Sequence, residues 1–245
     1  MWEFPHLRKS DPLLSYARSM ARSAKLPDLA EEDVLGMVGE AWLAWASDGL
    51  EDGRRLVLKD PSVRNLERFF RFFPRSFLLV LMRDGRDIAC SSLRSGFAAP
   101  QRFHALRPRT YRRIFVSGIG ELAGRWTAAS AEIRAFLETP GARARARLVR
   151  FEDLVREPER EVGAILEFLG LPADRFRWDA FAELGVRGSS FHGERAGSVD
   201  WSERRPEAFD PVGRWRAWSA RDTRRFGSVA SAELAHWGYE PAEPR

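Results

Sequence analysis

The sequence lacks residues and segments that several classes of protein need. Cys90 is the only cysteine, which excludes an intrachain disulfide and a metal site built from several thiolates. The four histidines have no spacing typical of zinc ligands, at His6, His104, His192 and His236. We therefore expect no metal in the functional site.

Long hydrophobic runs are also missing. No stretch approaches about 18 apolar residues without a charge, and no short apolar run with a small-residue cleavage site opens the chain. We therefore expect no membrane span and no secretory signal, and a cytoplasmic location. The 245 residues are 44% hydrophobic and contain no long polar tract, which favours one globular domain over residues 1–245.

Lysine is scarce, with only Lys9, Lys25 and Lys59, so arginine supplies almost all the positive charge of a chain whose formal net charge is +5. The planar guanidinium group suits phosphate and sulfate. Two interpretations are open: a general preference for arginine on a solvated surface, or a polyanionic partner. The arginines are spread through the chain and no nucleic-acid-binding module is recognisable, so we expect no nucleic acid partner.

The hydrophobic periodicity predicts an α/β fold. Helical spacing indicates two helices within residues 11–47 and further helices over 65–73, from about 111 to just before 140, after 158, over 214–226 and over 228–237. Short apolar runs predict strands over 55–58, 77–82 and 147–150. This order is typical of an open parallel sheet, which binds ligands at the carboxyl ends of its strands. We expect a helical part over 1–50, an α/β core over 54–172 and C-terminal helices over 213–240.

Residues 77–95, FLLVLMRDGRDIACSSLRS, are the most informative segment. A predicted strand leads into Arg83, and the helix that follows carries Ser91 two turns in. An arginine and a hydroxyl in these places can bind one phosphate, through hydrogen bonds worth roughly 1.5 to 3 kcal/mol each. From the residues alone an ion pair of Arg83 with Asp84 or Asp87, beside a solvated serine, is equally open.

The segment resembles the 3'-phosphate-binding motif of sulfotransferases that use 3'-phosphoadenylyl sulfate (PAPS). In that family an arginine ends the strand, and a serine eight positions later contacts the 3'-phosphate of the nucleotide. Arg83 and Ser91 match this spacing, and Gly85 stands where the family often has proline. The resemblance therefore implies that Arg83 and Ser91 bind the nucleotide.

A second segment, residues 148–172, resembles the same family. Its sequence, LVRFEDLVREPEREVGAILEFLGLP, is similar to a strand that ends in Tyr-Glu-Asp-Leu, followed by a helix that begins after a proline. Phe151 replaces the tyrosine, so a hydrogen bond from that hydroxyl is lost. The resemblance covers about residues 54–239 and implies a three-layer sandwich with a central parallel sheet, the P-loop nucleotide-kinase-like sulfotransferase fold.

LKDPS at residues 58–62 resembles a Lys-Asp-Pro sequence found in family members that act on protein tyrosine, which are nearest to this chain in the style of their motifs. This implies that Lys59 is catalytic, because a lysine there offsets the charge that develops on the leaving phosphate. A surface lysine at the end of a strand is the alternative.

The segment after the α/β core resembles the family's C-terminal loop, which closes over the nucleotide. We predict such a cofactor and substrate loop over residues 186–212, since loops of this length are often functional. The resemblance implies that Ser189, Ser190 and Arg214 bind the nucleotide. The alternative is a surface loop whose tryptophans only pack.

The first strand of the family and its glycine-rich 5'-phosphosulfate loop have no counterpart between Met1 and Leu58. We therefore expect the fold to lack both, through a late start codon or a deletion. In the tyrosine-directed relatives a glutamate lies nearly sixty residues before the lysine, and Glu3 lies 56 residues before Lys59. This implies that Glu3 is the catalytic base. His6 is a second candidate, and a terminal glutamate without a role is the alternative to both.

Together these motifs predict a nucleotide-binding transferase that moves a sulfuryl group from PAPS to a hydroxyl or amine acceptor without a metal. The expected partners are the nucleotide and the acceptor, with no membrane. Two alternatives are open: an inactive or shortened relative that binds the desulfo nucleotide 3',5'-ADP, and a basic nucleic-acid-binding protein.

Overall fold

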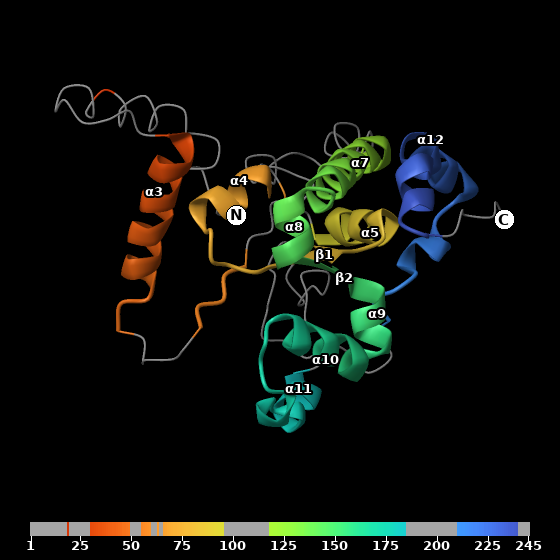
Figure 1. The fold of residues 1–245 in the computed structure, drawn as a ribbon. Helices are drawn as coiled ribbons and strands as arrows, with labels where there is room; N and C mark the ends of the chain where they lie inside the picture. Colours follow the sequence, from red (N-terminus) through yellow and green to blue (C-terminus); the bar gives the residue numbers. More distant parts are fainter. Residues whose placement is uncertain are drawn as a thin grey trace, which may run out of the picture. The chain divides into compact units, whose positions relative to one another are not determined.

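The computed structural model describes residues 19, 30–49, 55–59, 63, 66–95, 118–184 and 210–239. The chain divides into two compact units, one of Met1–Leu78 with Glu132–Ala146 and one of Leu79–Ala131 with Arg147–Arg245. Figure 1 draws the helices and strands of both units, and each unit is described by itself. The single domain over residues 1–245 stays a prediction.

Two helices pack together in the first unit. Helix α3 (Glu31–Ala46) and helix α4 (Leu66–Phe72) correspond to predicted helices, which are thereby confirmed. Val34 and Leu35 of α3 form a buried cluster with Phe72 of α4. A Cβ at Gly39 would lie only 1.7 Å from the Phe72 carbonyl oxygen, so glycine is what allows the two helices to approach this closely.

Helix α8 (Pro140–Arg145), also in the first unit, was not expected, because the sequence interpretation takes Pro140 as the end of the preceding helix. The backbone explains the difference. Thr139 caps α8 by accepting a hydrogen bond from the Ala142 amide, and proline suits the first position of a helix. Pro140 therefore both ends α7 (Gly118–Leu137) and begins α8.

The strand predicted over residues 55–58 is wrong. Residues 55–59 are exposed and belong to no helix or strand, and Val57 is 88% exposed. A strand is stable only where a neighbour pairs with its backbone N–H and C=O groups. The sheet in the described part of the chain consists of two other strands.

Those strands, β1 (Leu78–Met82) and β2 (Ala146–Arg150), pair in parallel and lie in the second unit apart from their first residues. The α/β class and the parallel pairing are therefore confirmed. Helix α5 (Gly85–Ser95) follows β1 after two residues, and α9 (Phe151–Arg156) follows β2 directly. Parallel pairing brings the carboxyl ends of both strands to the same edge of the sheet.

The remaining elements of this unit are helices. They are α10 (Pro158–Phe168), the short η2 (Ala173–Arg175), α11 (Trp178–Leu184), η3 (Arg214–Ala217) and α12 (Ala220–His236). Two predictions are corrected here. Residues 151–154, expected at the end of a strand, begin α9, and the two helices predicted over 214–237 are instead a short 3₁₀ turn and one long helix.

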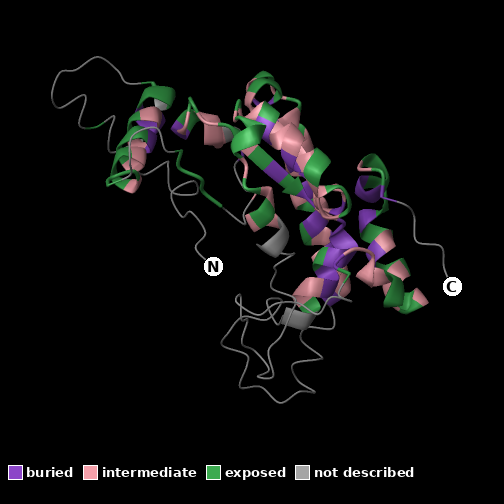
Figure 2. Ribbon diagram, turned by 90° about the horizontal axis from the view of Figure 1, so that it is seen from below, coloured by how far each residue is buried: buried purple, intermediate pink, exposed green. Residues whose placement is uncertain are grey.

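The core of the second unit is formed by residues of β1, α5, α7 and α12. Its buried side chains include Val80, Met82, Ala89, Trp126 and Phe226. Figure 1 shows α5 and α7 running side by side near β1, and the buried residues are purple in Figure 2. Burial of apolar surface on these three helices therefore fixes the start of α5 against the end of β1.

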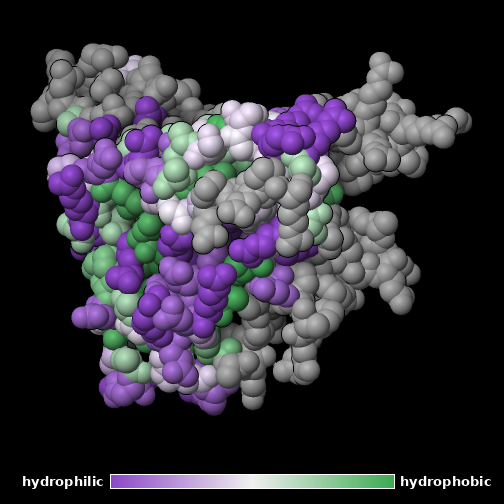
Figure 3. Space-filling model, turned by 90° about the vertical axis from the view of Figure 1, so that its right-hand side faces the viewer, coloured by the Kyte–Doolittle hydropathy of each residue, from purple (hydrophilic) through white to green (hydrophobic). Residues whose placement is uncertain are grey.

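The surface is largely polar, as the 31% content of charged residues leads one to expect. Hydrophilic side chains cover much of the face drawn in Figure 3, with smaller hydrophobic areas between them. Among the helices that the structure describes, none combines the length and the apolar character needed to cross a bilayer.

Candidate functional site

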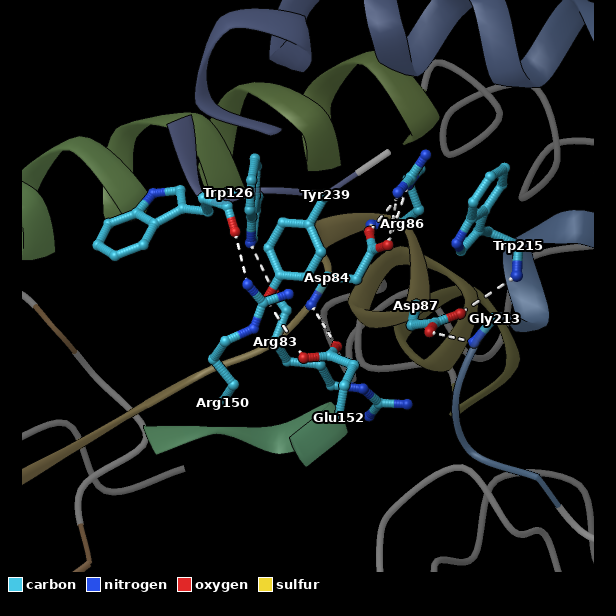
Figure 4. A network of polar contacts seen from close by, with 11 residues as sticks. Arg83, Asp84, Arg86, Asp87, Trp126, Arg150, Glu152, Gly213, Trp215 and Tyr239 are labelled. Atoms are coloured by element: carbon cyan, nitrogen blue, oxygen red, sulfur yellow. Dashed lines mark hydrogen bonds and ion pairs between the residues drawn. The ribbon is translucent and has the colours of Figure 1, made fainter. Parts of the chain in front are cut away.

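The candidate site begins at the carboxyl end of β1, where the peptide between Arg83 and Asp84 is held from both sides. The Trp126 indole N–H of α7 donates a 3.1 Å hydrogen bond to the Arg83 carbonyl oxygen. The Asp84 amide donates to Oε1 of Glu152 at 2.8 Å, and the Tyr239 hydroxyl lies 3.3 Å from Oε2 of the same carboxylate. Figure 4 shows these groups around the end of the strand.

The Arg83 side chain lies over the carboxyl end of β2. Its guanidinium carbon is 4.3 Å from the centroid of the Phe151 ring, a cation–π contact, and its Nη2 donates a 2.7 Å hydrogen bond to the Pro211 carbonyl oxygen. Its Nε is buried and has no hydrogen-bond partner among the residues that the structure describes. Burial is the largest cause lowering the pKa of Arg83, and the nearby Asp87 and Glu152 carboxylates oppose it.

Gly85 opens α5 against the face of an aromatic ring. A Cβ at this position would lie 2.3 Å from Cδ2 of Trp126. The sequence interpretation treats the glycine as a tolerated change in a turn. The structure adds a packing reason, because only glycine lets the start of α5 come this close to the indole.

The two carboxylates of the turn have other partners than Arg83. Asp84 forms a bidentate pair with Arg86, with a shortest distance of 2.7 Å, and Arg86 is only 3% exposed. Asp87 accepts hydrogen bonds from the Gly213 amide at 2.7 Å and the Trp215 amide at 3.2 Å. Within the described residues, neither carboxylate forms an ion pair with Arg83, so the ion-pair alternative for that arginine is wrong.

Burial raises the pKa of three acidic groups in this network, those of Asp87, Glu152 and Tyr239. It is the largest cause that raises the pKa of Asp87, against the lowering effect of the Gly213 and Trp215 amides. It likewise raises the pKa of Glu152, against the hydrogen bond from the Asp84 amide. The pKa of Tyr239 is raised by burial and then by the Glu152 charge. The hydrogen bonds to backbone amides are therefore what make these buried carboxylates tolerable.

The structure brings three of the predicted nucleotide-binding residues into one unit. Arg83 follows β1, Ser91 is half-buried on α5, and Arg214 is half-buried at the first position of η3. Lys59 belongs to the other unit and is described only there, in the exposed stretch over residues 55–59.

The other predicted site residues lie outside the described part of the chain: Glu3, His6, Ser189 and Ser190, with nearly all of the predicted loop over 186–212. Their roles stay predictions.

Sequence reasoning did not identify the residues that organise this region, chiefly Asp87, Glu152 and Trp126. Asp87 was considered only as a possible partner for Arg83, and Glu152 only as a match to a motif. Their contacts join positions far apart in the chain, such as 87 with 213 and 84 with 152. The one local signal in the sequence is a carboxylate next to an apolar segment, because such a carboxylate is often buried and then needs a hydrogen-bonding partner.

This arrangement has one feature that suits an anion. The Arg83 guanidinium group packs on the Phe151 ring, and its backbone carbonyl oxygen is held by Trp126. Its buried Nε–H has no acceptor in the described part of the chain. A phosphate or sulfate oxygen is the kind of group that satisfies it.

The sequence profile described as "Sulfotransferase family" matches residues 13–175. The match begins well before residue 54, where the resemblance was expected to begin, and ends before residue 239. A solved structure described as the sulfotransferase domain from the curacin biosynthetic pathway is similar, with a TM-score of 0.49 and 19% identity over 98% of this chain and 78% of that one. No curated protein matches. Because the profile spans more than half of the 245 residues, the chain belongs to the sulfotransferase family.

Proposed function

We propose that this chain transfers a sulfuryl group from PAPS to a hydroxyl or amine acceptor, and that Arg83 and Ser91 bind the 3'-phosphate of the nucleotide. Membership of the sulfotransferase family supports the reaction class. The observation that carries the choice of donor is the order β1, Arg83, α5 with Ser91, which places an arginine at a strand end and a hydroxyl on the following helix.

The surroundings of Arg83 fit a phosphate ligand. Its buried Nε–H has no acceptor within the described ranges, and a buried donor without a partner costs about 1 to 3 kcal/mol. A phosphate oxygen would remove that cost. Burial lowers the pKa of Arg83, but the group stays protonated at neutral pH because a guanidinium group does not lose its proton in proteins.

The remaining roles follow from the family resemblance. The acceptor oxygen or nitrogen attacks the sulfur in line, the bond from sulfur to the 5'-phosphate oxygen breaks, and 3',5'-ADP leaves. Lys59 offsets the charge on that leaving oxygen, and Glu3 takes the proton of the acceptor. Ser189, Ser190 and Arg214 bind the nucleotide phosphate from the C-terminal side.

The first test is calorimetric titration with 3',5'-ADP, the stable product of the donor. We expect the wild type to bind it and Arg83→Ala to bind at least about tenfold more weakly, which corresponds to one charge-assisted hydrogen bond. Arg83→Lys should recover little of the loss, because an ammonium group cannot reproduce the guanidinium fork. Arg160→Ala is the matched control, since Arg160 is exposed on α10 and forms ion pairs with the neighbouring Glu157 and Glu161.

The alternatives give different results in the same series. If a well-folded wild type does not bind 3',5'-ADP, the proposed donor is wrong. Strong binding of unrelated DNA at moderate salt, without binding of the nucleotide, would instead support a nucleic-acid-binding protein. Binding of 3',5'-ADP without any release of sulfuryl groups from PAPS, across a panel of hydroxyl and amine acceptors, would support an inactive relative.

A further inference from the structure

Asp87 joins two segments that are far apart in the sequence. It lies in the first turn of α5, midway between Arg83 and Ser91, and it is only 1% exposed. Its Oδ2 accepts from the Gly213 amide at 2.7 Å and its Oδ1 from the Trp215 amide at 3.2 Å. Figure 4 shows the carboxylate pointing at these two amides. Each carboxylate oxygen therefore has its own backbone donor.

The backbone over residues 213–215 has a shape that favours an anion. Gly213 has φ 77° and ψ 17°, in the left-handed region, and the 3₁₀ turn η3 begins at the next residue. A left-handed residue followed by right-handed ones turns successive N–H groups toward one side, which forms an anion-binding concavity. The Asp87 carboxylate fills that concavity.

Two further contacts tie the same segment to the same turn. The Arg83 guanidinium donates to the Pro211 carbonyl oxygen, and the Arg86 guanidinium carbon lies 3.6 Å from the centroid of the Trp215 ring. Residues 211, 213 and 215 are thus all held by the turn that carries Arg83. Of the three contacts, only the one through Asp87 orients the backbone through two hydrogen bonds.

The position of this segment gives the contact a consequence beyond packing. It begins within the last two residues of the nucleotide loop predicted over 186–212, and Arg214 stands between the two amides that Asp87 holds. A shift of the segment would also move the Pro211 carbonyl oxygen, which is the acceptor for Arg83 Nη2. Asp87 therefore determines the surroundings of Arg83 and the position of Arg214 together.

We propose that Asp87 is a positioning residue, which anchors residues 211–215 to the start of α5 so that Arg83 and Arg214 face the 3'-phosphate of the nucleotide. This inference rests on the proposed function. Asp87 does not touch the ligand itself, because both of its oxygens are engaged by backbone amides.

The test compares Asp87→Asn with the wild type. Asparagine keeps the shape of the side chain, but its single oxygen accepts from only one of the two amides, and its NH₂ group faces the other. We expect the affinity for 3',5'-ADP to fall about tenfold, equivalent to about 1.4 kcal/mol. The affinity for 5'-AMP, which lacks the 3'-phosphate, should not change. Hydrogen exchange at the Gly213 and Trp215 amides should become faster in the variant.

Glu233→Gln is the matched control for a merely structural effect. Glu233 is also a buried carboxylate of the second unit, 7% exposed, and it accepts hydrogen bonds from Ser130 and Trp237. Replacing it alters the contact between Ser130 of α7 and Glu233 of α12, which is a different contact from that of Asp87 with residues 213 and 215. We expect both nucleotide affinities to stay at the wild-type value.

A second variant keeps the test decisive if Asp87→Asn does not fold. Gly213→Pro leaves the Asp87 carboxylate in place but removes one of its donors and the left-handed conformation. It should give the same selective loss of 3',5'-ADP affinity. Wild-type affinity in whichever of these variants folds would overturn the inference while leaving the proposed function standing. A folded wild type that does not bind 3',5'-ADP would overturn the proposed function, and the inference with it.

Discussion

At Gly85 the main chain of α5 touches the indole of Trp126. The indole is nearly buried, and its N–H donates to the Arg83 carbonyl oxygen, so the ring cannot move away without giving up that hydrogen bond. A methyl group at residue 85 would overlap the ring, since its nearest ring atom would be at 2.3 Å. The glycine is therefore part of what fixes the direction in which Arg83 leaves the strand.

We expect Gly85→Ala to lower the free energy of unfolding by about 1 to 3 kcal/mol, the usual cost of overpacking. Gly124→Ala is the control, because a Cβ at Gly124, also within a helix, meets nothing within 4 Å. Alanine is the better helix former there, so Gly124→Ala should be neutral or slightly stabilising. Urea denaturation of both variants measures the difference. Equal urea midpoints for the wild type and Gly85→Ala would show that the Trp126 ring moves to make room for the methyl group without loss of stability.

The role of a residue could be predicted from the sequence where it depends on local order. Arg83 and Phe151 each follow an apolar run, and parallel strands bring such residues to one edge of the sheet. In the structure the Arg83 guanidinium carbon lies 4.3 Å from the centroid of the Phe151 ring. The partners of Asp87 could not be predicted in this way. They are backbone amides 126 and 128 residues later, and any amide in a turn has the same chemistry.

Among the helices, α12 has the clearest start signal. The Ser219 hydroxyl accepts from the Asp222 amide and donates to the Asp222 carboxylate, so one of the free N–H groups of the first turn is satisfied. The helix then continues through Gly227, which lies between the two helices that the sequence predicts over 214–226 and 228–237. Buried Phe226, Ala230 and Leu234 recur on one face across that glycine and hold the helix together.

We expect Ser219→Ala to cost about 1 kcal/mol of stability, the typical value for the loss of an N-cap. Ser228→Ala is the matched control on the same helix. The Ser228 hydroxyl is exposed and donates to the Arg225 carbonyl oxygen within the same turn, so its loss should cost nothing measurable. Thermal or chemical unfolding of the two variants gives the comparison. A Ser219→Ala variant as stable as Ser228→Ala would rule out the cap.

The strands could be predicted only in part, as a comparison of two apolar runs shows. Residues 77–82 and 55–58 look alike in the sequence, yet only the first lies in a strand. Strand pairing depends on a second segment, and nothing within a run says whether that segment is in reach. Helices close their hydrogen bonds internally, which is why α3, α4 and α10 were predicted more reliably.

For the whole molecule, the net charge of +5 does not translate into a positive site. The polar network around the end of β1 contains three arginines and three carboxylates, namely Arg83, Arg86, Arg150, Asp84, Asp87 and Glu152. These charges sum to zero when all are ionised. Arg214, which the proposal places at the 3'-phosphate beside Arg83, lies outside this balanced set. Attraction of an anion must therefore come from the placed guanidinium groups of Arg83 and Arg214 and not from a broad positive field.

The same network makes stability depend on pH, and Glu152 shows in which direction. Burial is the main cause that raises its pKa above the ordinary value of 4.5, so the folded state binds this proton more tightly than the unfolded state. The protonated Glu152 therefore contributes to the stability of the folded state. This contribution is fully present below pH 4.5 and is lost as the pH rises through the pKa of Glu152 in the folded state. In Glu152→Gln the amide oxygen can still accept from the Asp84 amide, its NH₂ group can donate to the Tyr239 oxygen, and the side chain does not titrate. The variant should therefore gain stability relative to the wild type as the pH rises above 4.5.

Chemical denaturation of both proteins at a series of pH values measures this difference. Asp179→Asn provides a control of opposite sign, because the hydrogen bond from Arg177 lowers the pKa of the exposed Asp179 below its ordinary 3.8. For this pair the wild type loses stability relative to Asp179→Asn as the pH falls. A difference between Glu152→Gln and the wild type that does not change with pH would mean that Glu152 ionises in the folded protein as it does in the unfolded chain. In that case the hydrogen bond from the Asp84 amide would fully offset the burial of the charge.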